Sequence, residues 1–362
     1  MVCTYLLVTI YTKNELNHFI SKHEDQTKYS YCLYQILDNL LVIIMNKIII
    51  NTHFYSCGQL EGFIKSYLNF KLDIIQITSG KLHGELSISK FNDINITRIK
   101  TNQGLLIYGD ANTDIVNISL ETSEFLELHR AQGELLPKNA LSGFGCVKSE
   151  IYFTVSPGSD LFVATLLKPK FVNCMNNIHG ECGVEYLHSQ NIQSIKICNF
   201  QHIKSLFKTF LCRSHNSNEQ VISDDFIYHI SESLCQNTNL PSDKRTKLKN
   251  PELAREFVQM TISNRINRPL CIDDLKNLLF TSKTVLSKSV RDATGLSPIA
   301  FVKRLRLEQI RSKLILHEEL PHSVESLAKQ YGFKSRGHFS RYYRDVYGEL
   351  PSKTIQMAYT IK

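Results

Sequence analysis

The sequence predicts an α+β multidomain protein. A β-rich N-terminal domain of sandwich or barrel type, accompanied by helices, precedes an all-α C-terminal domain with two helix-turn-helix units. Three observations predict this fold: short alternating runs recur between residues 71 and 167, helical periodicity takes over from residue 251, and the net charge of +8 belongs to that last region. The 362 residues suffice for two or three domains that each bury a core.

The β-rich domain is expected at residues 51–190. Its runs recur about every 8–12 residues between Gly, Asn, Asp and Pro, a rhythm that favours an antiparallel sandwich or small barrel over βαβ units. Residues 1–50 show no clean period and are poorly defined. Met45 is a candidate start, so whether residues 1–44 belong to the native chain stays open. The expected strands are LDIIQI, GELSIS, DINITRI, GLLIYG, DIVNISL, EIYFTV and DLFVATL.

A helical pair is expected at residues 191–235, and a linker at 236–250. Residues 224–234 form one amphipathic segment, and the stretch 191–212 forms the other. The linker, QNTNLPSDKRTKLKN, has almost no apolar residue. The apolar residues at near-helical spacing in 191–212 are Ile195, Phe200, Ile203, Leu206, Phe207 and Phe210.

Residues 251–362 are expected to form the C-terminal domain. In its first unit, residues 271–279 predict a short helix. Ser282 then caps a second helix, Lys283–Thr294, which ends at Gly295. The residues expected to face the core of this unit are Val285, Leu286 and Val290.

Ser297 and Pro298 predict the start of a long helix that runs to about residue 316. At roughly 1.5 Å per residue it is long enough to bridge two subdomains. Ser323 caps the short helix of the second unit, Gly332 closes that helix, and Ser335 opens the last recognition-type helix. We expect Phe301, Leu305, Ile310 and Leu314 on one side of the long helix, and Val324, Leu327, Ala328, Phe339, Tyr343 and Val346 in the core.

Spaced residues in this domain resemble the AraC/XylS family of bacterial transcription regulators over about 100 residues. The second unit contributes AKQYGF (328–333), Phe339-Ser340-Arg341, Tyr343-Arg344 and GELPS (348–352). The first unit and linker helix contribute GLSPIAF (295–301), Arg306 and Leu314. The departures are Tyr343 in place of Phe, Ile310 in place of a small residue, Leu350 in place of Ser or Thr, and a missing final Arg, and they concern packing details.

The N-terminal region is similar to the ethanolamine-utilisation regulators of that family and to their cyanobacterial relatives. The similarity centres on GKLHGE (80–85) and the strands after it. It implies a ligand-sensing or dimerising β domain, so that residues 51–190 would be the sensor or regulatory domain. It does not fix a ligand.

The resemblance implies a sequence-specific DNA-binding transcriptional regulator of double-stranded promoter DNA, more often an activator, to which RNA polymerase responds. A small-molecule effector and a homodimer stay open. Residues 251–362 hold 19 Lys and Arg against 11 Asp and Glu, whereas the remaining residues hold 23 of each, as expected for one polyphosphate-binding domain. The residues expected to contact DNA are Thr284, Ser287, Lys288, Arg291, Arg336, His338, Ser340, Arg341 and Arg344.

No motif predicts an enzyme, a metal site or a cofactor. The ten cysteines include no CxxC pair, and neither a phosphate-binding glycine loop nor GxSxG occurs. The triplet His179-Gly180-Glu181, beside Cys182, lacks the P-C-x-x-C partner of zinc deaminases. The triplet His83-Gly84-Glu85 lacks the second His of an HxH cupin site. Because no apolar run reaches the roughly 20 residues of a membrane span, and no signal peptide is evident, we expect a cytoplasmic protein.

Two other classes remain open on sequence grounds. A DNA-directed enzyme would need an activated Cys or a metal cluster within residues 1–250. An architectural DNA-binding protein without ligand sensing would bind DNA with little sequence specificity. Competition between specific and random duplexes separates this last class from a regulator.

Overall fold

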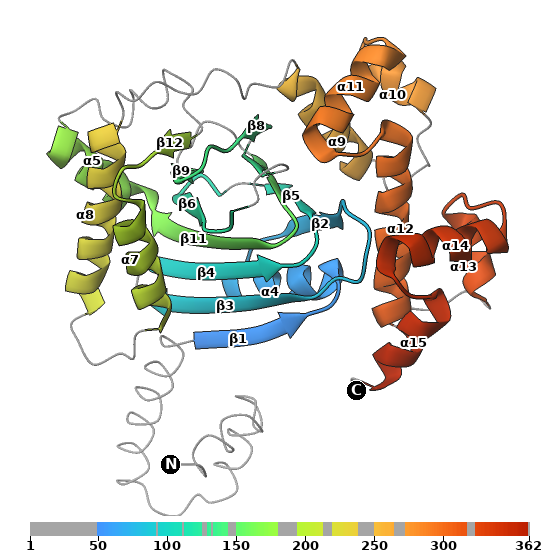
Figure 1. The fold of residues 1–362 in the computed structure, drawn as a ribbon, viewed down its shortest axis with the longest axis horizontal. Helices are drawn as coiled ribbons and strands as arrows, with labels where there is room; N and C mark the ends of the chain where they lie inside the picture. The colour runs from blue at the N-terminus through green and yellow to red at the C-terminus, as the bar shows by residue number, and fades with distance from the viewer. Residues whose placement is uncertain are drawn as a thin grey trace, which may run out of the picture. The chain divides into compact units, whose positions relative to one another are not determined.

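The computed structural model describes residues 49–91, 93–110, 112–124, 129–131, 133–143, 150–179, 194–212, 219–237, 250–263, 272–316 and 323–360 (Figure 1). The expectations for Met45, for the linker stretch 238–249 and for Gly180–Cys182 lie outside these residues. Every described residue belongs to one compact unit, residues 49–362.

Two antiparallel sheets form the β-rich domain (Figure 1). Each of the seven runs expected to be a strand lies on a strand, so this part of the prediction is confirmed. In spatial order, the larger sheet contains β1 (Ile49–Phe54), β3 (Gly84–Phe91), β4 (Ile94–Thr101), β11 (Ser159–Leu167), β6 (Ile115–Glu121), β9 (Ala140–Ser142) and β12 (Ser194–Lys196). The smaller sheet contains β2 (Leu72–Gln76), β5 (Leu105–Asp110), β10 (Glu150–Val155), β7 (Arg130–Ala131) and β8 (Glu134–Leu135).

The larger sheet is buried on both faces. One face packs under α5 (Lys168–His179), α7 (Phe200–Cys212) and α8 (Glu219–Asn237), where Ile96 and Phe162 meet Phe207 and other apolar side chains of the helices. Since successive side chains of a strand point to opposite faces, Ile99 and Leu161 turn the other way. They share a core with Ile107 of the smaller sheet. The alternating side chains of these strands therefore give the larger sheet an apolar core on each of its two faces.

Two local expectations were wrong. The helix expected from residue 191 begins at Phe200, because Ile195 pairs with Leu141 in the ladder between β12 and β9. Helix α8 continues through Asn237, so the first two residues of the expected linker are helical. In addition, α4 (Cys57–Leu68) was not foreseen; Ser56 caps it, and its buried Leu60 and Ile64 belong to the core between the sheets.

The C-terminal domain contains seven described helices (Figure 1). The long helix α12 contributes residues to two hydrophobic clusters. Its four apolar residues were expected on one side of the helix, and this expectation was wrong. Phe301 and Leu305 belong to the cluster of the first unit, whereas Ile310 and Leu314 belong to that of the second. At 100° per residue, Phe301 and Ile310 lie about 180° apart. The helices are α9 (Pro251–Ser263), α10 (Ile272–Leu278), α11 (Lys283–Thr294), α12 (Pro298–Leu316), α13 (Val324–Gln330), α14 (Arg336–Tyr347) and α15 (Pro351–Thr360).

Within the part of the chain that the structure describes, no helix combines the length and the apolar character needed to cross a membrane.

Candidate DNA interface and ligand cavity

The first helix-turn-helix unit consists of α10 and α11. The Ser282 side chain accepts a hydrogen bond from the Val285 amide at 3.3 Å, and Gly295 closes the helix with φ of 74°. A positive φ suits glycine because it has no Cβ. Buried Leu286 and Val290 anchor α11 in the core, as expected from the sequence.

Val285 was expected in that core and is 40% exposed instead. The buried residues of α11 are Leu286, Ser289, Val290, Ala293 and Thr294, a stripe at i, i+3, i+4, i+7 and i+8. Val285 lies roughly 100° from the middle of this stripe. It therefore shares the outer face with Thr284, Lys288 and Arg291, which are exposed, while Ser287 is half-buried.

The second unit repeats this construction with α13 and α14. Ser335 caps α14, and Gly348 ends it with φ of 69°. The expected core residues Phe339, Tyr343 and Val346 are buried against Leu307 and other residues of α12. Tyr343 stands where the AraC/XylS family usually has Phe, and its hydroxyl is hydrogen-bonded to Thr354 Oγ1 at 2.8 Å. That bond lets a polar atom be buried at this position without penalty.

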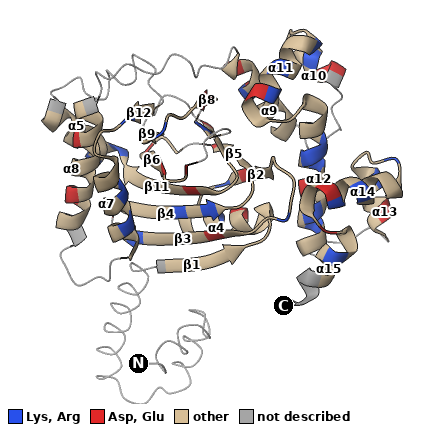
Figure 2. Ribbon diagram, in the orientation of Figure 1, with Lys and Arg blue, Asp and Glu red and all other residues tan. Residues whose placement is uncertain are grey.

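The polar face of α14 points away from the core. Arg336, His338, Arg341 and Arg344 are exposed, and Ser340 is half-buried. Figure 2 marks Lys and Arg positions along α11, α14 and α15. All nine residues expected to contact DNA therefore lie on the two second helices of the units, with their side chains at least partly accessible.

The helix-turn-helix domain model matches residues 276–357, which run from α10 into α15. The curated relatives are regulators of transcription by name: XylDLEGF operon transcriptional activator 2 of Pseudomonas putida is 29% identical over 102 residues, 28% of this chain and 65% of the relative. The chain carries an AraC-type helix-turn-helix domain. XylDLEGF operon transcriptional activator 1 of the same organism is 31% identical over 107 residues, 30% of this chain and 32% of the relative.

Regulatory protein HrpB of Ralstonia nicotianae is 35% identical over 74 residues, 20% of this chain and 16% of the relative. The chain thus spans less than two thirds of each of these relatives. Among solved structures, ToxT from Vibrio cholerae covers 86% of this chain and 99% of its own at 13% identity, with a TM-score of 0.29.

The AraC-type domain contacts the β-rich domain through a row of buried charged residues on α12. Arg304 donates to the Thr78 carbonyl at 2.9 Å, and Arg311 donates to the Tyr55 carbonyl at 3.2 Å. Glu308 accepts from the Gln76 amide at 3.3 Å. All three charged residues are less than 10% exposed.

This row was not predicted from the sequence, although a signal for it exists. Positions 304, 308 and 311 follow the i, i+4, i+7 spacing of one helix face, and the apolar residues of α12 occupy other faces. Burial raises the pKa of Glu308 and is the largest influence on it, with Arg311 acting in the opposite direction. Arg311 also pairs with Glu349 at 3.1 Å and lies over the Tyr347 ring at 4.2 Å. The row therefore ties α12, α14 and β2 into one network.

A second contact joins the β-rich domain to the first unit. Glu150, at the start of β10, pairs with Arg255 of α9 at 2.9 Å and is also hydrogen-bonded to Gln259. Beside it, Tyr152 belongs to the same hydrophobic cluster as Phe257 and other residues of the AraC-type domain. Strands β2, β5 and β10 of the smaller sheet thus contribute to the core beneath α11.

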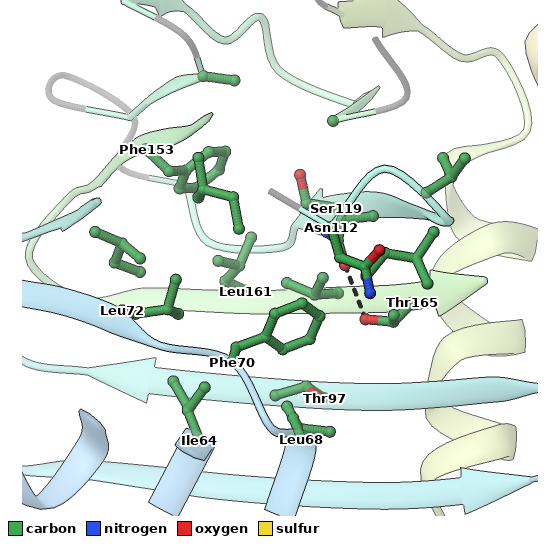
Figure 3. Close-up of a pocket in the computed structure, with 18 of the residues that line it drawn as sticks. Ile64, Leu68, Phe70, Leu72, Thr97, Asn112, Ser119, Phe153, Leu161 and Thr165 are labelled. Atoms are coloured by element: carbon green, nitrogen blue, oxygen red, sulfur yellow. Dashed lines mark hydrogen bonds between the residues drawn. The ribbon is translucent and has the colours of Figure 1, made fainter. Parts of the chain in front are cut away.

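A cavity of about 180 Å³ lies between the two sheets (Figure 3). That is many times the roughly 10–15 Å³ that one water molecule needs. Of the described residues that line it, Glu150 carries the one carboxyl group, and Arg255 pairs with it at 2.9 Å. Most of the lining is apolar, including Ile64, Leu68, Phe70, Leu72, Ile99, Ile107, Ile115, Ile151, Phe153, Leu161 and Val163.

Polar groups of the lining cluster on the larger sheet. Thr165 donates a hydrogen bond to the Asn117 side chain at 2.8 Å (Figure 3). Ser119 is hydrogen-bonded to Ser142 at 2.6 Å. The Thr97 hydroxyl is buried and has no hydrogen-bond partner among the described residues. An unpartnered buried hydroxyl costs free energy, so Thr97 is the group that a bound molecule would satisfy.

The other triplet considered for metal binding is not assembled into a site. Glu85 pairs with Lys100 at 3.1 Å, and the His83 ring packs against His53 and Tyr55. Among the residues that the structure describes, no three His, Cys, Asp or Glu side chains gather in a way that could hold a metal ion.

Proposed function

We propose that this protein is a sequence-specific transcription regulator that binds promoter DNA through α11 and α14 and responds to a small, mainly apolar molecule. The pair of exposed basic helices in an AraC-type domain carries the first half of this proposal. A helix with such side chains fits the major groove, where Arg and Lys pair with guanine and Ser and Thr contact bases or phosphates. The names of the relatives favour activation, with RNA polymerase as the responding partner.

Selection from random duplexes tests the DNA-binding half. Purified full-length protein is mixed with a pool of random-sequence duplexes, and bound DNA is recovered over several rounds. We expect one motif with two half-sites about one helical turn, roughly 10 bp, apart. Uniform recovery of all sequences would instead favour an architectural protein, and no recovery at low salt would exclude both functions.

The cavity between the sheets supports the second half of the proposal. Its apolar lining favours an apolar molecule, and the Thr97 hydroxyl favours a ligand with at least one polar group. Glu150 belongs both to the lining and to the ion pair with α9, so an occupant of the cavity touches a residue that holds the AraC-type domain. Linkage then requires that ligand and DNA change each other's affinity by the same factor.

Two variants test the ligand site. Thr97→Val removes the hydroxyl at nearly constant volume and should weaken ligand binding while leaving folding intact. Val163→Phe fills the cavity and should abolish the response to ligand. The readout is the thermal shift of the full chain across a panel of small apolar compounds, with DNA affinity measured beside it. If no compound shifts the wild type more than Val163→Phe, the cavity is not a ligand site.

A further inference from the structure

A second hollow lies where the β-rich domain meets the second helix-turn-helix unit. Its volume is about 580 Å³. The residues that line it come from the loop before β3, from the end of α14 and from the start of α15. They are Lys81, Arg344, Gly348, Glu349, Leu350, Ser352, Lys353 and Gln356.

The charge in this hollow is positive. Lys81, Arg344 and Lys353 are all exposed. The one carboxylate of the lining, Glu349, is buried and already accepts from Arg311 at 3.1 Å and from Thr354 at 2.8 Å. Helix α15 begins at Pro351, so the positive end of its dipole faces the same region. An anion is therefore the ligand that this chemistry favours.

The loop that carries Lys81 is fixed against α14. The Gly80 amide donates to the Val346 carbonyl at 2.8 Å, and the Lys81 carbonyl accepts from the Asn102 side chain at 2.9 Å. The loop lies close to the end of α14, because a Cβ built at Gly348 would lie 3.3 Å from the backbone nitrogen of Lys81. Lys81 is thus held beside the C-terminal end of the second recognition helix.

We infer that this hollow receives a phosphate of the DNA backbone, next to the groove that α14 reads, and that Lys81 makes the β-rich domain part of the DNA interface. Arg344 is the link, since it lines the hollow and lies on the polar face of α14. Phosphate contacts position a protein on duplex DNA without reading its sequence. A shift of the loop at residues 79–81 then changes DNA affinity directly. This inference rests on the proposed DNA binding.

The test measures binding of the full chain to a labelled duplex of mixed sequence over a range of salt concentrations. Each phosphate contact contributes about 0.9 to the slope of log affinity against log salt. Lys81→Ala should lower that slope by about this amount, with a loss of roughly tenfold at 50 mM salt that shrinks to about threefold at 200 mM. Lys353→Ala should behave in the same way, and Lys81→Arg should keep both slope and affinity.

Lys196→Ala is the matched control. Lys196 is an exposed lysine on β12, at the other edge of the larger sheet, and its replacement should leave the slope unchanged. An Ala variant at Lys81 that loses affinity with no change of slope would assign the residue a purely structural role and overturn the inference.

A further experiment measures the stability of the protein as inorganic phosphate is added at constant ionic strength. Saturable stabilisation of the wild type that depends on Lys81, together with unchanged DNA binding by Lys81→Ala, would identify a small-anion site and overturn the inference. If the wild type binds no duplex at all, both this inference and the proposed function are wrong. If the wild type binds and Lys81→Ala equals Lys196→Ala, this inference alone is wrong.

Discussion

Glu308, in the middle of α12, accepts a hydrogen bond from the backbone amide of Gln76 in β2, 232 residues earlier in the chain. The same carboxylate oxygen lies 3.7 Å from the Cys57 thiol of α4. A buried carboxylate thus receives donors from two elements of the β-rich domain while it belongs to the helix that joins the two DNA-binding units. The relative position of these units is therefore tied to the β-rich domain.

The first prediction concerns this contact. Glu308→Ala leaves the Gln76 amide without its acceptor and removes the carboxyl group that interacts electrostatically with the buried Arg311, so it should lower the free energy of unfolding by about 1–3 kcal/mol. Glu308→Gln keeps an oxygen acceptor and removes a buried charge, so it should be close to wild type in stability. Denaturant unfolding of both variants measures the difference. Equal destabilisation by Gln and Ala would mean that the charge, not the hydrogen bond, holds the contact.

The second prediction separates base reading from phosphate binding on α14. Arg336 and Arg341 lie five residues apart, about 140° around the helix, and flank its outward face. Arg341→Ala should cost roughly 1–3 kcal/mol on a selected site and little on random DNA, as expected for a bidentate guanine contact. Titration against selected and scrambled duplexes measures this. Equal losses on both duplexes would make Arg341 a phosphate contact.

The third prediction concerns Arg344, which lies one turn beyond Arg341 and lines the basic hollow. Arg344→Ala should weaken binding to selected and scrambled duplexes by similar factors. It should also reduce the salt slope by about one unit. The titration is repeated at several salt concentrations. A loss confined to the selected duplex would instead assign Arg344 to base reading.

The fourth prediction concerns the route from cavity to DNA. Glu150→Gln keeps hydrogen-bonding atoms at the cavity edge but removes the ion pair with Arg255. We expect ligand binding to persist while the effect of ligand on DNA affinity shrinks. The coupling is measured as the ratio of DNA affinities with and without ligand, compared between wild type, Glu150→Gln and the converse variant Arg255→Gln. Unchanged coupling in both variants would exclude this ion pair as the route.

The fifth prediction is a pH dependence of stability. His129 is fully buried, with Nδ1 3.3 Å from Glu121 Oε2. Burial lowers the pKa of His129 to about 4, although Glu121 acts to raise it, so the ring is neutral at pH 7 and this contact is no ion pair. A histidine in the unfolded chain titrates near 6.5. Between these values the folded state binds fewer protons, so its stability is present above pH 6.5 and is lost as pH falls towards 4.

The loss over that interval should approach about 3 kcal/mol, the equivalent of the shift in pKa. Unfolding free energies of wild type and His129→Phe across the interval measure it. The Phe variant keeps a ring against Phe153, which lies 5.1 Å from the His129 ring, and removes the titrating group. A difference between the two proteins that does not change with pH would contradict the assigned pKa.

The sequence by itself determined the local structure and the presence of an AraC-type helix-turn-helix domain. Alternation predicted the seven strands, while caps and closing glycines such as Ser282 and Gly295 predicted the helix-turn-helix units. These features depend on neighbours within a few residues, which is why they can be read from one chain. Spaced residues of the second unit indicated the AraC/XylS family in the same way.

Tertiary structure decided where these elements meet. Ile195 sits near helical spacing yet lies in β12, because pairing with Leu141 competes with the local helical preference. The apolar residues of α12 were predicted to lie on one side of the helix. In the structure, α12 instead packs against two hydrophobic clusters and also contacts the β-rich domain. The cavity, the row of buried charges and the meeting of Lys81 with Arg344 join residues far apart in sequence. Such contacts depend on the packing of whole layers, which no local pattern specifies.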